Sequence, residues 1–309
     1  MFNELFSRGG LSLDRLRSFL ALAHAGSIAK AAPGDVTRQS QISRQIGELE
    51  SFFGAELTMR RGKTLALSEA GKRLAVLIRQ QLQDLDDFRI EQSAAKKAFT
   101  IGASASVLDW MVVPAMPGIR KTLNGATVRL EAMRSRSVVD AVRDGRFDFG
   151  VVREDAIPKQ ARSSMISLLK LSFHLCIPKR LIKRGTLVKD LSKPGVWQAL
   201  PFTAGNEGGQ MDAAIRDAMR DAGVDFRPVV ECYSTLQARQ LIQRGECAGI
   251  LPSLGVAGLS AKDIHIIEFA PLKNYGRHLV LHWNERQMRR RGVEAAAIKQ
   301  MAKALQSHL

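Results

Sequence analysis

The sequence predicts a two-domain α/β protein, in which a small helical domain precedes a larger domain of alternating strands and helices. Helical periodicity dominates residues 13–92, and from residue 99 onward short β-rich runs such as 147–152 alternate with helical stretches. A length of 309 residues suits about two domains. We place the join near residues 93–97, where the apolar period lapses and small and charged residues gather.

Composition restricts the partners and the compartment. The chain has 46 Lys and Arg against 30 Asp and Glu, a net charge of +16, which favours polyanions or anionic small molecules as partners. Residues 1–92 hold 13 basic and 11 acidic side chains, so most of the excess lies in the second domain, where dispersed solubilising charge also explains much of it. Three scattered cysteines fit neither a disulfide framework nor a zinc site. Without a signal peptide or a long apolar run, we expect a cytoplasmic protein that makes no membrane contact.

The first domain has the outline of a helix-turn-helix. An apolar stripe indicates a helix that Gly26 ends, after which Ser27 caps a short second helix reaching about residue 32. Pro33 and Gly34 break that helix, and Asp35 or Thr37 caps a third one that continues to residue 53. Two helices joined by a tight turn containing glycine are typical of this motif.

The third helix separates an apolar face from a polar, cationic one. Ile42, Ile46, Leu49 and Phe53 share the apolar face. Ser, Gln and Arg side chains on the opposite face can hydrogen-bond base edges in a major groove, although an ordinary solvated face has the same pattern. The residues that we assign to DNA binding on this helix are Thr37, Arg38, Ser40, Gln41, Ser43 and Arg44.

Two elements complete the domain. Residues 57–67 read as a β-hairpin whose basic tip, with Arg61 and Lys63, would lie along a phosphate backbone. A long helix capped by Ser68 follows. It carries an apolar stripe that predicts helix pairing between two chains, with docking on its own domain as the alternative. The stripe consists of Leu74, Ile78, Leu82 and Leu85.

This domain resembles the DNA-binding domain of LysR-type transcriptional regulators, in order and spacing without a gap over about 55 residues. The departures lie at Pro33-Gly34-Asp35, Arg38 and Thr58, and they affect the angle between the second and third helices. The resemblance implies a winged helix-turn-helix in residues 1–67 and a linker helix in 68–92. It also implies a homodimer, with four chains expected to assemble, that reads an interrupted inverted repeat in double-stranded DNA. The matching residues are Leu16-Arg-Ser-Phe-Leu20, Gly26-Ser27, Ala31-Ala32, Gln39-Ser-Gln-Ile-Ser-Arg-Gln-Ile46, Leu49-Glu50, Phe53-Gly54, Glu56-Leu57, Arg60 and Leu67-Ser-Glu-Ala-Gly71.

The remainder, residues 93–309, resembles the family's effector-binding domain more weakly. The similar segments are Ile101-Gly-Ala-Ser104, Val138-Val-Asp-Ala-Val-Arg-Asp-Gly145, Phe147-Asp-Phe-Gly150 and Gly245-Glu-Cys-Ala-Gly-Ile-Leu-Pro252. The resemblance implies two lobes of periplasmic-binding-protein type with a small molecule between them. We place the crossings between the lobes near Ser163 and Phe269, which assigns 99–163 with 270–309 to lobe I and 164–269 to lobe II.

Candidate effector-binding residues follow predicted strands. Ser104 and Ser106 place hydroxyl groups at a helix N-terminus, which suits a carboxylate or phosphate, although such serines also serve as helix caps. Arg134 follows a strand and brings a cation toward the same cleft. The segment 201–206 resembles the second-lobe loop that faces the cleft, and it contributes Thr203 and Asn206. We therefore expect a small, anionic effector.

The sequence offers no catalytic constellation. The run after residue 101 lacks the closing glycine of a nucleophile elbow, and the six histidines have no metal-ligand spacing. We therefore expect a regulator that is not an enzyme and that needs neither a metal nor another cofactor, with RNA polymerase as a candidate partner. The alternative is a cytoplasmic small-acid-binding protein or enzyme with a degenerate DNA-binding domain.

Overall fold

The computed structural model describes residues 3–61, 64–93, 95–205, 209–275 and 277–307. Two compact units are present: Met1–Ala95 together with Asp144–Arg146, and the remainder of the chain. In the described part of the chain no helix is both long enough and apolar enough to cross a bilayer.

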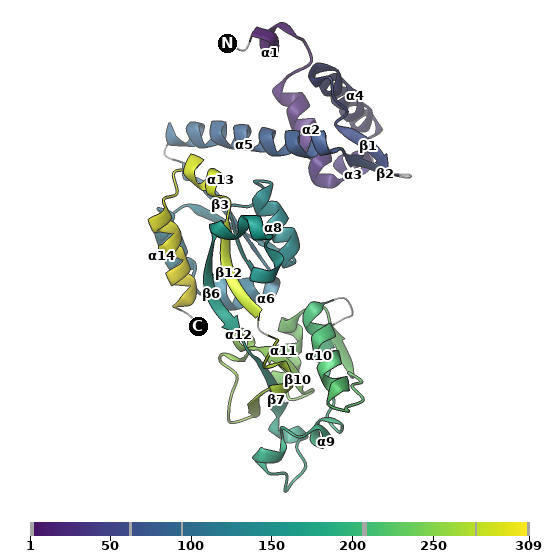
Figure 1. Ribbon diagram of the computed structural model, residues 1–309, viewed down its shortest axis with the longest axis vertical. Coiled ribbons are helices and arrows are strands. Elements are labelled where there is room, and N and C mark those ends of the chain that lie inside the picture. Colours follow the sequence, from purple (N-terminus) through teal and green to yellow (C-terminus); the bar gives the residue numbers. More distant parts are fainter. Residues whose placement is uncertain (1–2, 62–63, 94, 206–208, 276, 308–309) are drawn as a thin grey trace. The chain divides into compact units, whose positions relative to one another are not determined.

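Local capping chemistry sets the helices of the first unit. The side-chain oxygens of Ser12, Ser27, Asp35 and Ser68 each accept a backbone N–H in the first turn of the helix that follows. Gly26 ends a helix with a φ of 74°, a left-handed conformation that favours glycine. The helices are α1 (Asn3–Ser7), α2 (Leu13–Ala25), α3 (Ile28–Ala31), α4 (Val36–Phe53) and α5 (Glu69–Glu91), and the hairpin strands are β1 (Thr58–Arg61) and β2 (Thr64–Leu67) (Figure 1).

The core of the first unit lies where α2, α4 and α5 meet. Phe19, Ile42 and Leu49 are almost fully buried there. Close contact between α5 and the hairpin requires Gly71, because a Cβ at that position would lie 2.0 Å from the carbonyl oxygen of Leu57. One predicted core residue is wrong: Phe52 is buried, whereas Phe53 is 38% exposed, because the apolar face of α4 turns toward position 52 at its end.

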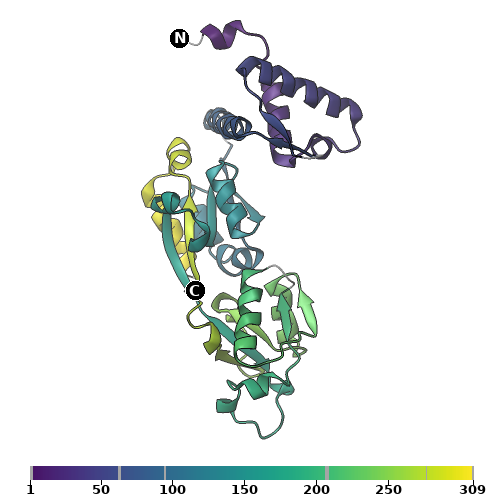
Figure 2. The same ribbon diagram turned by 45° about the vertical axis from the view of Figure 1, so that its right-hand side comes forward.

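Lobe I of the second unit is a five-stranded sheet in the order β4-β3-β5-β12-β6. Strand β3 is parallel to β4 and β5, and β12 is antiparallel to β5 and β6. Helix α8 covers one face, and α7 and α14 cover the other. Helices α8 and α14 are seen on opposite sides of the sheet in both views (Figure 1 and Figure 2). The strands are β3 (Ala98–Ala103), β4 (Thr127–Ala132), β5 (Phe149–Arg153), β6 (Met165–Leu171) and β12 (Arg277–Trp283); the helices are α6 (Ala105–Val107), the π-helix η1 (Leu108–Val112), α7 (Met116–Thr122), α8 (Ser135–Arg143), α13 (Glu285–Arg290) and α14 (Ala295–Gln306).

Lobe II is built around β7, which lies between the antiparallel strands β10 and β11. A second pair of strands, β8 and β9, runs parallel beside it. The strands are β7 (Phe173–Pro178), β8 (Thr203–Gly205), β9 (Val230–Cys232), β10 (Gly249–Pro252) and β11 (Ile264–Glu268); the helices are α9 (Pro194–Trp197), α10 (Gln210–Asp221), α11 (Thr235–Gln243) and α12 (Ser253–Val256). The short 3₁₀ turns are η2 (Glu154–Ala156), η3 (Lys159–Ser164), η4 (Lys179–Leu181), η5 (Val188–Asp190) and η6 (Ala270–Leu272).

Both predicted lobe crossings are too early in the chain. Strand β6 pairs with β12 in lobe I, so the first crossing lies at Ser172 and not near Ser163. Phe269 and Leu272 lie in the core of lobe II and Tyr275 packs against it, whereas Arg277 begins β12 of lobe I, so lobe II extends beyond Phe269. The boundary depends on strand pairing, which the sequence pattern of a single strand does not reveal.

A buried ion pair holds the end of α13 to the sheet of lobe I. Arg291 Nη1 donates to Asp148 Oδ1 over 2.6 Å, and both side chains are less than a tenth exposed. The N–H of Thr100 and the amide of Gln287 donate to the same carboxylate, each over 2.8 Å. Arg291 Nη2 also donates to the carbonyl of Ala98.

We predict that Asp148→Ala lowers the free energy of unfolding by about 3–5 kcal/mol, because it leaves a guanidinium buried without its carboxylate. Arg289→Ala is the control, since it breaks the exposed pair with Glu285 and should cost no more than about 1 kcal/mol. Urea denaturation of both variants measures the difference. Equal small losses would show that the Asp148 pair does not hold this end of the lobe.

Candidate functional site

The first candidate surface is the outward face of α4. Thr37, Ser40, Ser43 and Arg44 are exposed on it, while Arg38 and Gln41 are half-buried. Arg38 Nη1 donates to Gln41 Oε1 over 2.8 Å, which orders the two side chains beside each other. Thr37, Ser40, Gln41 and Arg44 are therefore turned away from the core residues Ile42, Ile46 and Leu49, and Arg38 and Ser43 flank them.

The turn before α4 is well supported despite its unusual sequence. Asp35 Oδ1 accepts the N–H of Arg38 over 2.8 Å, and the side chain of Gln39 donates to the carbonyl of Ala32 over 2.7 Å. Gly34 has a φ of 76°, which a residue with a Cβ rarely adopts. Of the two predicted caps, Asp35 is therefore the correct one and Thr37 lies inside the helix.

Glu50 attaches the hairpin to α4, a role that sequence reasoning missed. Its Oε1 accepts the N–H of Leu57 over 2.8 Å and the N–H and hydroxyl of Thr58 over 3.0 Å each. One carboxylate thus fixes the start of β1 relative to the α4 surface. The position of Thr58 in the sequence, where a hydroxyl replaces the family's usual aromatic residue, was the available signal. Arg60 is exposed on β1; Lys63 and the side chain of Arg61 lie outside the described residues.

The apolar stripe of α5 divides between the core and the surface. Ile78 is buried, and Leu74 and Leu82 pack partly buried against the core of the first unit. The core of the unit thus takes up Ile78, whereas Leu74 and Leu82 stay partly exposed, and their pairing with another chain stays a prediction. Leu85 is 60% exposed, and Leu77 and Phe88 are exposed beside it on the same side of the helix. We call Leu77, Leu85 and Phe88 the exposed α5 row.

The second candidate site lies where the parallel strands of lobe I end. Pairing of Ala103 with Ala132 and with Val151 brings the carboxyl ends of β3, β4 and β5 to one edge of the sheet. Ser104 follows β3 there, and its hydroxyl makes no capping bond to the following helix; it lies 3.5 Å from the hydroxyl of Ser106. Arg134 follows β4, is exposed, and forms no ion pair with any residue that the structure describes. Ser104, Ser106 and Arg134 form the strand-end site.

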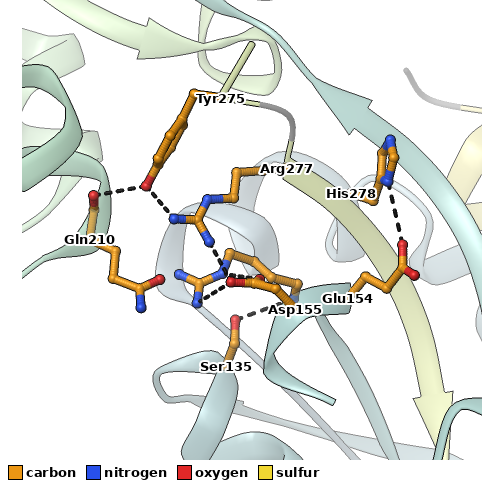
Figure 3. Close-up of polar contacts among 8 residues, drawn as sticks. Ser135, Glu154, Asp155, Gln210, Tyr275, Arg277 and His278 are labelled. Atoms are coloured by element: carbon orange, nitrogen blue, oxygen red, sulfur yellow. Dashed lines mark hydrogen bonds and ion pairs between the residues drawn. The ribbon is translucent and has the colours of Figure 1, made fainter. Parts of the chain in front are cut away.

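A cluster of charged residues extends this edge to the hinge between the lobes (Figure 3). Arg153 donates from Nε to Asp155 Oδ1 over 2.9 Å, and Arg277 Nη1 donates to Asp155 Oδ2 over 2.5 Å. Arg277 also donates to the Tyr275 hydroxyl, which in turn donates to the carbonyl of Gln210 in lobe II over 2.8 Å. Partial burial disfavours ionisation of Asp155, but its two arginine partners outweigh that cost and lower its pKa. We call Arg153, Asp155, Tyr275 and Arg277 the hinge cluster.

Sequence reasoning did not bring these residues together. Arg277 opens the last strand, and its closeness to Arg153 follows from the pairing of Leu279 with Arg153. That pairing joins residues more than a hundred positions apart, so no local motif reports it.

The structure describes one of the two predicted effector residues of lobe II. Thr203 is 4% exposed, and its hydroxyl lies 3.2 Å from the Sγ atom of Cys232 inside the lobe. Thr203 begins β8, two residues before the strand end, and its contact with an effector stays a prediction. Asn206 lies outside the described residues.

Trp110 bridges the two lobes beyond the strand-end site. The guanidinium of Arg239 in α11 lies 6.0 Å from the centre of the Trp110 ring. Gly255 in α12 packs under the same ring, since a Cβ there would lie 2.8 Å from two of its atoms. Trp110 follows Ser106 by one helical turn, so the strand-end site connects directly to lobe II.

The three cysteines are buried and free of disulfides. Burial raises the pKa of Cys176 to about 12 and also raises the pKa of Cys247. Such thiols stay protonated and poorly nucleophilic at neutral pH. The described residues contain no group of three or more His, Cys, Asp or Glu side chains placed to hold a metal ion.

Comparisons with known families match both units. A model of the "bacterial regulatory helix-turn-helix protein, lysR family" matches residues 13–72, and one of the "LysR substrate binding domain" matches residues 92–305. The HTH-type transcriptional regulator PecT of Dickeya dadantii (strain 3937) is 29% identical over 140 residues, which are 45% of this chain and 44% of that one. An uncharacterised HTH-type transcriptional regulator of Mycobacterium tuberculosis (strain ATCC 25618 / H37Rv) is 23% identical over 276 residues, 86% and 88% of the two chains.

Solved structures share the fold. A full-length variant of OxyR from Pseudomonas aeruginosa matches with a TM-score of 0.59 and 17% identity, covering 96% of this chain and 94% of that one. CbnR in complex with its target DNA matches with a TM-score of 0.56 and 18% identity, covering 97% and 100%.

The Glu50 contacts predict a stability effect. Glu50→Ala should lower the free energy of unfolding of residues 1–95 by about 1.5–3 kcal/mol, because it removes an ionised acceptor from two backbone N–H groups. Glu56→Ala, which changes an exposed glutamate in the same loop, should have little effect. Hydrogen exchange at the N–H groups of Leu57 and Thr58 locates the change. Unaltered protection in Glu50→Ala would mean that the hairpin is held by other contacts.

Proposed function

The chain belongs to the LysR family of helix-turn-helix transcriptional regulators, and from this premise we propose that its α4 surface reads an interrupted inverted repeat in double-stranded DNA and that a small anionic effector controls it. The observation that carries the DNA proposal is the α4 surface, where Thr37, Ser40, Gln41 and Arg44 are turned away from the buried residues of the helix and Arg38 and Ser43 flank them. A recognition helix places residues near its N-terminus in the major groove, and these six lie in its first nine positions. Arg44 and Gln41 are suited to guanine and adenine edges respectively.

A two-fold dimer explains how one chain would read a repeat. Two copies of α4 related by a dimer axis contact half-sites on one face of DNA when these are about 34 Å apart. We propose that the exposed α5 row forms this dimer contact, because three large apolar side chains on one helix are left open to solvent. Assembly of two dimers into a tetramer extends the same proposal.

The anionic effector is supported by charge and by a hydroxyl that makes no capping bond. The Ser104 hydroxyl has only a long, 3.5 Å contact with the Ser106 hydroxyl among the described residues, and Arg134 brings an unneutralised cation to the same edge. In the hinge cluster two arginines share one carboxylate. This edge of the sheet therefore favours a carboxylate or phosphate.

The alternatives are less well supported. An enzyme would need an activated nucleophile or an acid-base pair at the strand-end site, and among the described residues neither Ser104 nor Ser106 has a histidine, lysine or carboxylate within hydrogen-bond distance of its hydroxyl. One OxyR structure, of a mutant protein from Corynebacterium glutamicum, is H2O2-bound. We do not extend peroxide binding to this chain, because the raised pKa values of Cys176 and Cys247 oppose thiolate chemistry. Regulation of chromosomal genes in the cytoplasm, with RNA polymerase as a partner, completes the proposal.

Substitutions on α4 and on β1 should have different effects on DNA binding. Arg44→Ala should lower the binding free energy at a specific site by about 1–3 kcal/mol and relax the base preference there, because it removes contacts to a base edge. Arg60→Ala should weaken binding to all DNA sequences alike, and it should reduce the slope of log affinity against log salt concentration by about one phosphate contact. Fluorescence anisotropy with a specific and a scrambled duplex over a salt series separates the two. Equal loss on both duplexes from both variants would contradict the assignment of α4 as the base-reading element.

The exposed α5 row predicts the oligomeric state. Leu85→Glu should weaken the dimer by at least about tenfold, because two carboxylates would be buried near the symmetry axis. Gln243→Glu adds the same charge at an exposed polar position of α11, away from this row, and is the control. Sedimentation velocity measures the dissociation, and a Leu85→Glu dimer of unchanged stability would exclude this row as the contact.

A further inference from the structure

The hinge cluster carries more positive charge than its structural contacts require. The side chains of Arg153 and Arg277 are 24% and 16% exposed, while Asp155, the carboxylate that they share, is 50% exposed. The neighbouring Glu154 is engaged by other groups, lying 3.4 Å from His278 Nδ1 and 3.9 Å from Arg162 Nη1. Two half-buried guanidinium groups thus face one carboxylate, which leaves one positive charge in a site that is partly removed from water.

Donor capacity also remains. Arg153 donates to Asp155 through Nε and Nη2, and Nη1 makes no hydrogen bond to any residue that the structure describes. Ser135 orders the same position from α8, because its hydroxyl accepts the backbone N–H of Arg153 over 3.3 Å. Arg153 is therefore held in place with part of its planar donor set free, and such a set matches the geometry of a carboxylate.

The cluster lies beside the strand-end site. Strand β3, which Ser104 follows, is adjacent to β5, which ends at Arg153, and β12, which begins at Arg277, is the next strand. Neighbouring strands are about 4.8 Å apart, so the serine and the two arginines lie about 5–10 Å apart along this edge. Short dicarboxylates span that distance.

We propose that Arg153 and Arg277 form a second anion subsite and that the effector is a small dicarboxylate, with one acid group at Ser104 and the other between the two arginines. This inference rests on the effector cleft of the proposed function. Asp155 occupies part of the subsite and competes with the ligand for the arginines. Binding of the second acid group would also reach lobe II, since Arg277 donates to Tyr275 and Tyr275 donates to the carbonyl of Gln210 (Figure 3).

Calorimetry with chain-length-matched acids tests the proposal on the full-length protein. The probes are succinate, glutarate and adipate, each compared with the monocarboxylate of the same carbon number: butyrate, valerate and hexanoate. At least one dicarboxylate should bind about tenfold or more tightly than its partner, because it gains charge-assisted hydrogen bonds to two arginines. Equal affinities within every pair, or no binding by any dicarboxylate at millimolar concentration, would overturn the proposal.

Three variants distinguish a ligand subsite from a structural lock. Arg277→Gln should abolish the preference for dicarboxylates, and Arg153→Gln provides the same test if Arg277→Gln fails to fold. Asp155→Asn should tighten dicarboxylate binding severalfold, because it removes the competing negative charge while keeping the side-chain shape. Parallel weakening by Asp155→Asn and Arg277→Gln would show that the three residues serve only as a structural lock, and the proposal would fail. Arg220→Gln removes an arginine from an exposed pair with Asp217 and is the charge-matched control.

One further variant separates failure of this inference from failure of the effector cleft. Ser104→Ala should weaken monocarboxylates and dicarboxylates alike, because both use the first subsite. If Ser104→Ala has this effect while Arg277→Gln has none, the cleft stands and the second subsite is refuted. If Ser104→Ala changes neither series although a dicarboxylate binds with dependence on Arg277, the subsite stands and the strand-end site is misplaced.

Discussion

The architecture of the second unit depends on the pairing of one strand, β12, with both β5 and β6. The chain leaves lobe I at the end of β6 and returns at the start of β12, and Arg277 pairs with Leu171 at that point. Both connections between the lobes therefore lie side by side in the sheet. The same pairing places Arg277 next to Arg153 at the carboxyl edge of the parallel strands, so one register fixes both the hinge and the charged cluster beside it.

This arrangement suggests how a bound anion changes the protein. Side chains from β5, η2 and β12 meet at Asp155, and the Tyr275 hydroxyl extends the contacts to the start of α10 in lobe II. On the other side of the strand-end site, Trp110 packs against Arg239 and Gly255 of lobe II. A ligand that binds one arrangement of the lobes better than another shifts the population toward it, and DNA affinity responds only through that difference. The buried Asp148–Arg291 pair holds the far end of lobe I.

Local chemistry was predictable from sequence, and long-range pairing was not. Ser27, Asp35 and Ser68 act within three residues of themselves, so their capping roles could be inferred correctly from the pattern. The lobe crossings, the buried position of Thr203 and the meeting of Arg153 with Arg277 depend on which strands pair. For the α5 stripe, periodicity identifies an apolar face, but tertiary packing decides which part of it the domain covers. Leu82 is thus partly buried whereas Leu85 is exposed.

The central claim is that this chain is a DNA-binding regulator whose second unit senses a small anion. Footprinting of the purified protein on the DNA upstream of its own gene, with and without a dicarboxylate that binds it, tests that claim most directly. The account predicts two protected half-sites with an inverted relationship, spaced by a whole number of DNA turns, and a change in protection when the ligand is added. Uniform, salt-sensitive protection without defined boundaries, unchanged by the ligand, would contradict it.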